Sequence, residues 1–182
     1  SNFLSLWSCA FSKSLRTAFT SGLWNRLEFG RKWAGFGHKR SIMCVVALAL
    51  NADPRWRIII AANRDEFHDR PSAPLDRWAD NAHLIAGRDL RSGGTWLGVS
   101  EQGRLAVITN VRGLAPDPSL ESRGTLVSHV LAGAGRYANP EAGDLGRFNA
   151  FNLIVADAKG ARVLTNRPSP AISPLEPGIH AV

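Results

Sequence analysis

The fold is decided by the stretch MCVVALALNADPRWRIIIAANRDE, which runs from Met43 to Glu66. Its two apolar runs, residues 44–50 and 58–62, are aliphatic, partly β-branched and of strand length. The residues between them, 51–54, are mostly turn formers. The stretch therefore predicts a β-hairpin, and four polar side chains, residues 63–66, follow its second strand.

The sequence beyond this hairpin predicts an α+β domain. Apolar residues recur at helical spacing in residues 121–131, and Gly133 follows as a helix end. A second helix is expected at residues 141–148. Further strands are expected at residues 83–86, 95–99, 105–109, 151–155 and 162–164. The rest of residues 71–93 predicts a surface loop, and the proline-rich residues 167–178 predict irregular chain.

The positive charge of the chain is concentrated near its start. The formal net charge is +7, and residues 1–42 hold seven basic residues against one acid. The remaining residues, 43–182, hold fifteen basic and fourteen acidic residues. A nearly neutral body argues against nucleic acid as its partner.

Residues 1–42 differ in composition from everything that follows. They are rich in Ser and basic residues, and the sole methionine, Met43, lies at the boundary. This composition is typical of a transit peptide, and translated upstream sequence outside the working protein is the alternative. We therefore expect an extension at 1–42 and one domain at 43–182. The protein is then cytoplasmic, or mitochondrial if the extension is a genuine transit peptide.

Common motifs for cofactors and metals are not found in this sequence. Cys9 and Cys44 are the only cysteines and form no CxxC pair, and the five histidines show no paired ligand spacing. The glycine-rich residues 93–98 lack the spacing of a nucleotide-binding loop. No apolar run reaches the length of a membrane-spanning helix. We therefore assign no metal, no cofactor and no transmembrane segment.

The polar group at residues 63–66 has two interpretations. It is either a polar turn containing an Arg–carboxylate pair, or a buried cluster at the end of a sheet that tunes a nearby nucleophile. Cys44, directly behind Met43, is the candidate nucleophile. It could instead be a buried structural cysteine.

Several separate motifs occur in the order that is seen in one family. They are Met43-Cys44, Asn63-Arg64-Asp65-Glu66 followed by Arg70-Pro71, Ala86-Gly87-Arg88-Asp89, Gly93-Gly94-Thr95-Trp96-Leu97-Gly98, Thr109-Asn110 with Arg112, Ser122-Arg123-Gly124 and Phe151-Asn152-Leu153. On these motifs the chain resembles the NRDE family, also called the transport and Golgi organisation protein 2 family. The resemblance covers residues 43 to about 178.

This resemblance implies a fold related to the N-terminal nucleophile hydrolases, a four-layer αββα sandwich. In such a protein, Cys44 exposed at the N-terminus would be the nucleophile, and its own α-amine would be the base. Arg64 and Asp65 would position the amine and thiol, and Asn110 would donate to an oxyanion. A family chain normally continues beyond residue 178, so we expect this domain to be incomplete at its C-terminus.

Three functional readings follow. The first is a thiol amidohydrolase acting on a small amide or acyl substrate. The second is a protein that binds or traffics a lipid, an acyl group or haem without turnover, linked to Golgi or secretory organisation. The third is a non-functional gene fragment, in which later strands are missing.

The position of Met43 predicts that the working polypeptide begins at Cys44. Intact mass or N-terminal sequencing of protein from its native cell should show Cys44 as the first residue. A stable, folded protein that keeps residues 1–42 would contradict the self-base mechanism, since the α-nitrogen of Cys44 would then be an amide.

Overall fold

The computed structural model describes residues 44–64, 66, 69–111 and 115–182. The chain separates into two units, Ser1–Ser41 and Ile42–Val182, and all the described residues belong to the second. No helix in these residues is long and apolar enough to cross a membrane.

The first hairpin forms as predicted and is longer than expected. Strand β1 (Val45–Asp53) pairs antiparallel with β2 (Trp56–Asn63). On its other side, β1 pairs antiparallel with β10 (Gly178–Ala181), the last strand of the chain. β1 is therefore the central strand of a three-stranded sheet.

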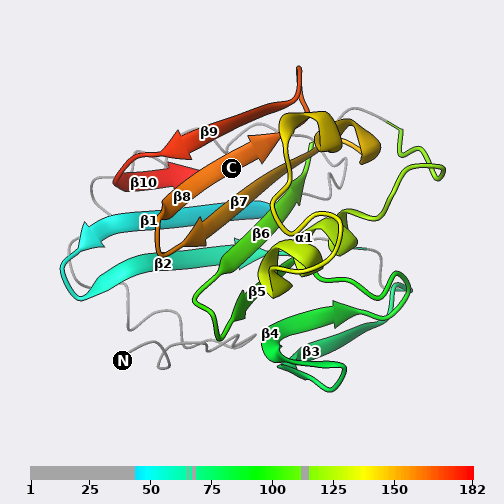
Figure 1. The fold of residues 1–182 in the computed structure, drawn as a ribbon, viewed down its shortest axis with the longest axis horizontal. Coiled ribbons are helices and arrows are strands. Elements are labelled where there is room, and N and C mark those ends of the chain that lie inside the picture. Colours follow the sequence, from blue (N-terminus) through cyan, green and yellow to red (C-terminus); the bar gives the residue numbers. More distant parts are fainter. Residues whose placement is uncertain (1–43, 65, 67–68, 112–114) are drawn as a thin grey trace, which may run out of the picture. The chain divides into compact units, whose positions relative to one another are not determined.

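The second sheet has seven antiparallel strands that follow one another in chain order (Figure 1). Its strands are β3 (Ser72–Trp78), β4 (Asn81–Asp89), β5 (Leu97–Ser100), β6 (Leu105–Asn110), β7 (Phe151–Asp157), β8 (Gly160–Thr165) and β9 (Ala171–Leu175). The four strands predicted at residues 95–99, 105–109, 151–155 and 162–164 are present, and they pair as the hairpins β5–β6 and β7–β8. This sheet is mostly a meander of neighbouring strands.

The two sheets pack face to face. Val46 and Leu48 of β1 are buried against Val107 of β6 and Ile154 of β7. Neighbouring residues of β6 and β7 point to the opposite face, because successive side chains alternate across a strand. That face packs against a helix, so the expected α+β sandwich is confirmed with layers of sheet, sheet and helix.

Helix α1 (Arg123–Ala132) covers the outer face of the seven-stranded sheet (Figure 1). The Oγ of Ser122 caps its start by accepting a hydrogen bond from the backbone N–H of Gly124. Gly133 ends it in the left-handed conformation, with φ of 63°, as the sequence predicted. The expected second helix is the 3-10 helix Ala142–Arg147.

Two predictions of irregular chain were wrong. Residues 71–93 contain the hairpin β3–β4, and residues 167–178 contain β9 and the start of β10. Pro74 in β3 and Pro174 in β9 had argued against strands. Both β3 and β9 are edge strands of the sheet, where a missing backbone N–H is tolerated.

The start of α1 touches the segment between β4 and β5 through two glycines. A Cβ atom added to Gly94 would lie 2.3 Å from the carbonyl carbon of Gly124. The backbone N–H of Thr95 donates to the carbonyl of Gly124 at 3.4 Å. This approach of two backbones sets the position of the helix start relative to the sheet.

The Gly94→Ala substitution should destabilise the fold by about 1–3 kcal/mol or more, because the clash is with backbone that must move. Urea unfolding followed by circular dichroism measures the change. Gly143→Ala is the matched control, since an added Cβ there meets nothing within 4 Å. Equal stability of the two variants would contradict the close packing of Gly94 on Gly124.

Candidate active site

A cavity of about 350 Å³ opens beside the start of β1. Its walls come from the ends of the first hairpin, the β4–β5 segment, the end of β6 and the start of α1. The lining side chains that bear on the chemistry are Cys44, Arg64, Glu66, Arg70, Asp89, Trp96, Asn110, Asp117, Glu121, Ser122 and Arg123. The site thus combines a thiol, several guanidinium groups and an amide.

Cys44 directly precedes β1 and is partly buried. The side-chain Oδ1 of Asn63, at the end of β2, accepts a hydrogen bond from the backbone N–H of Val45 at 2.7 Å. Val45 and Asn63 are also partners in the strand register. Asn63 therefore fixes the end of the hairpin, and the thiol next to it.

Arg64 lies against an aromatic ring. Its guanidinium carbon is 4.3 Å from the centre of the Trp96 ring, which is cation–π geometry. Its Nη2 is 3.6 Å from the Oε2 of Glu66. Gly87 leaves the space for this ring, because a Cβ there would lie 2.8 Å from Trp96. Arg64 is thus held at the cavity wall by stacking and by an ion pair.

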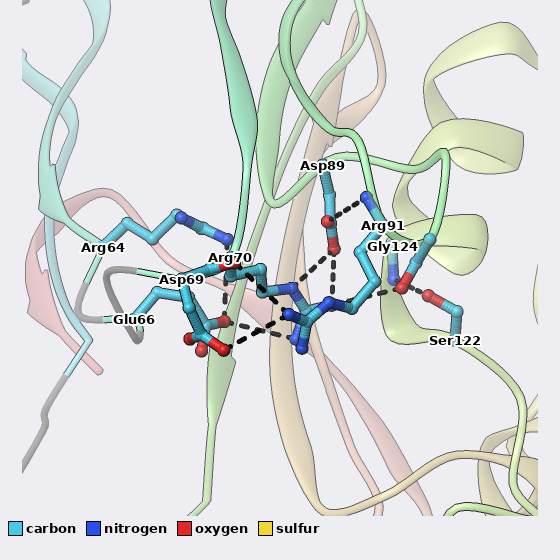
Figure 2. A network of polar contacts seen from close by, with 9 residues as sticks. Arg64, Glu66, Asp69, Arg70, Asp89, Arg91, Ser122 and Gly124 are labelled. Carbon is cyan, nitrogen blue, oxygen red and sulfur yellow. Dashed lines mark hydrogen bonds and ion pairs between the residues drawn. The ribbon is translucent and has the colours of Figure 1, made fainter.

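Arg70 joins two carboxylates in a network that Figure 2 shows. Its Nε donates to the Oδ2 of Asp89 at 3.0 Å, and its Nη1 lies 3.4 Å from the Oε2 of Glu66. Asp89 also accepts a hydrogen bond from the backbone N–H of Arg91. Burial raises the pKa of Asp89, but the hydrogen bonds from Arg70 and Arg91 outweigh it and the net pKa is lowered.

Arg123 is the first residue of α1 and is partly buried. Its Nη1 donates to the backbone carbonyl of Ala150 at 2.9 Å. Burial lowers the pKa of its guanidinium, and the nearby charge of Arg70 lowers that pKa further. Glu66 and Cys44 are close enough to act in the opposite direction. Arg123 therefore lies in the same electrostatic neighbourhood as the thiol.

Asn110 ends β6 and faces the cavity from the sheet. A further wall comes from residues 116–122. Asn149 tethers this wall by accepting from the backbone N–H of Asp117 at 2.7 Å and donating to its carbonyl at 2.8 Å.

Three of the predicted site residues, Cys44, Arg64 and Asn110, line this one cavity, and their catalytic roles stay a prediction. Asp65, the fourth predicted site residue, lies outside the described residues. In the described part of the chain the carboxylate that pairs with Arg64 is Glu66.

Sequence reasoning missed four residues at this site as functional candidates. They are Arg70, Asp89, Trp96 and Arg123. All four lie in the motifs quoted for the family resemblance, which was the available signal. Arg70, Asp89 and Arg123 are far apart in the chain, so spacing alone did not show that they line one cavity.

Among the described residues, no group of three or more His, Cys, Asp and Glu side chains is placed to hold a metal ion.

Fold and site together define an α+β sandwich with a cysteine in the lining of its cavity. The sequence profile of the family described as Transport and Golgi organisation 2 matches residues 43–182, and the chain belongs to this family. The Transport and Golgi organization 2 homologs of Mus musculus and Homo sapiens are each 36% identical over 155 residues, covering 77% of this chain and 56% of each relative.

More distant similarities were also found. Transport and Golgi organization protein 2 of Drosophila melanogaster is 26% identical over 147 residues, covering 69% of this chain and 52% of that protein. The chain thus spans about half the length of the curated relatives it matches. A solved Caenorhabditis elegans N-acylethanolamine-hydrolyzing acid amidase ortholog gives a TM-score of 0.46 at 12% identity, covering 76% of this chain and 69% of that one.

The Asp89→Asn substitution should lower the free energy of unfolding at pH 7 by about 1–3 kcal/mol, because it removes the charge that pairs with Arg70 in a partly buried place. The folded-state pKa of Asp89 is lowered, so its stabilising effect is present at neutral pH and is lost as the pH falls through that pKa. The difference between wild type and variant should therefore shrink below about pH 4.

Urea unfolding at a series of pH values measures this difference. Asp80→Asn is the control, since Asp80 pairs with Arg88 on the exposed surface and its removal should cost much less. A difference for Asp89→Asn that stays constant into the acid range would contradict the assigned ion pair.

Proposed function

We propose that this protein is a thiol-dependent amide hydrolase whose nucleophile is Cys44, with residues 43–182 as its working domain. The observation that carries the proposal is that Cys44 shares one cavity with Arg64 and Asn110. Thiol, guanidinium and amide are the groups that acyl transfer needs: a nucleophile, a positive charge that favours the thiolate, and a donor for an oxyanion.

In this mechanism, removal of the chain up to Met43 frees the α-amine of Cys44. The amine accepts the thiol proton, and the sulfur attacks the carbonyl carbon of the amide. The C–N bond then breaks, the leaving amine takes the proton back from the α-ammonium group, and a thioester forms on Cys44. Water, deprotonated by the same amine, attacks the thioester and releases the carboxylic acid and the thiol.

Two neighbours have separate roles in this mechanism. Arg64, held by Trp96 and Glu66, supplies a fixed positive charge near the thiol. Asn110 lines the cavity from the end of β6, and its side-chain N–H group is the proposed donor to the oxyanion. For Asp65 we propose the role that the family resemblance implies, to position the amine and the thiol together with Arg64.

The compartment follows from the N-terminus. We propose the cytoplasm for a chain that starts at residues 43–44, and the mitochondrion if residues 1–42 act as a transit peptide.

Iodoacetamide labelling tests the proposed nucleophile, since the thiolate rather than the thiol is alkylated. Protein starting at Cys44 should be labelled faster at neutral pH than N-acetylcysteine, and Arg64→Ala should reduce this advantage. Arg88→Ala is the matched control. The guanidinium carbon of Arg88 lies 4.3 Å from the centre of the Trp78 ring, and Arg88 pairs with Asp80. Arg88 thus has the same kinds of partner as Arg64 but does not line the cavity.

A labelling rate no higher than that of N-acetylcysteine would contradict the nucleophile and favour a carrier of an acyl or lipid ligand. Cys44→Ser separates the two roles further. Acyl transfer should be lost in this variant, whereas a carrier would keep its ligand binding.

A further inference from the structure

The arginines that line the cavity differ in how their charges are matched. Arg64 lies 3.6 Å from Glu66, and Arg70 is hydrogen-bonded to Asp89. Two of the cationic side chains thus have carboxylates as partners, with Glu66 also 3.4 Å from Arg70.

Arg123 has a different surrounding. Within the described ranges, no carboxylate lies at ion-pair distance from its guanidinium, which donates a hydrogen bond to the neutral carbonyl of Ala150. Glu66 raises the pKa of Arg123 through its charge alone, from beyond ion-pair distance. Arg123 therefore brings a positive charge to the cavity wall that these residues do not neutralise.

The two other carboxylates of the cavity wall are engaged elsewhere. Asp117 accepts from the backbone N–H and the hydroxyl of Ser119. Glu121 accepts from the hydroxyl of Tyr137 at 2.6 Å, with Arg136 and Arg147 within 4 Å of the same oxygen. None of these four partners lines the cavity, so neither carboxylate is available to Arg123 in this arrangement.

A partly buried guanidinium with no carboxylate at ion-pair distance costs free energy, and a negatively charged ligand in contact with it would lower that cost. We propose that Arg123 binds an anionic group, a carboxylate or a phosphate, of the molecule that occupies this cavity. The Ser122 cap adds to the site by placing the positive end of α1 at the same wall. This inference concerns binding and does not depend on turnover at Cys44.

Isothermal titration of the folded protein with benzoate, phenyl phosphate and benzamide tests the proposal. Benzoate and benzamide have nearly the same shape and differ in charge. At least one of the two anions should bind at least about tenfold more tightly than benzamide. The reason is that a desolvated pair of the anion with the Arg123 guanidinium is strongly favourable. Whichever anion binds more tightly identifies the anionic group as a carboxylate or a phosphate.

Arg123→Gln removes the charge and keeps an N–H donor for the carbonyl of Ala150, so it should fold and lose the preference for anions. Arg123→Lys should keep part of that preference. Arg104→Ala is the matched control, because Arg104 donates to one backbone carbonyl, that of Leu131, near the other end of α1. It should keep the wild-type preference.

Two results would overturn the proposal: equal binding of both anions and benzamide to wild type, or an anion preference that persists in Arg123→Gln. Labelling of Cys44 is measured separately, so a passive thiol would leave this result unaffected.

Discussion

The position of β1 is the constraint on which the rest of the site depends. This strand is hydrogen-bonded on both sides, to β2 and to β10, and its inner residues Val46 and Leu48 are buried against the second sheet. A strand fixed in three directions cannot shift its register without moving apolar side chains out of the core. Cys44 lies one residue before the start of β1, so its backbone position is fixed by that strand.

Close backbone packing helps to position two of the charged groups of the cavity. Arg123 stands at the start of α1, whose place is set by the contact of Gly94 with Gly124. Arg64 stacks on Trp96, for which Gly87 leaves room. Gly87, Gly94 and Gly124 therefore allow the close packing that places Arg64 and Arg123 at one cavity.

The sequence was most informative where local patterns decide structure. The hairpin β1–β2, helix α1 and its end at Gly133 follow from apolar periodicity and from turn and cap residues. The strands β3 and β9 were missed because prolines count against a strand, and only the sheet topology shows that both lie at edges.

The candidate site could be predicted only in part, for a related reason. Cys44 and Arg64 were found because they flank one hairpin, and Asn110 because it ends a strand. The ion pair of Arg70 with Asp89 and the placement of Arg123 at the cavity depend on contacts between distant segments, so no local spacing reveals them.

The central claim is that Cys44 forms an acyl-enzyme inside this cavity. The most direct measurement is peptide mass spectrometry of protein starting at Cys44 after brief exposure to p-nitrophenyl acetate. The account predicts one acetyl group on Cys44 that appears with the release of nitrophenol, turns over in water, and forms more slowly when Asn110 is replaced by Ala. An unmodified Cys44, or acetylation spread over surface lysines at the same rate, would contradict it.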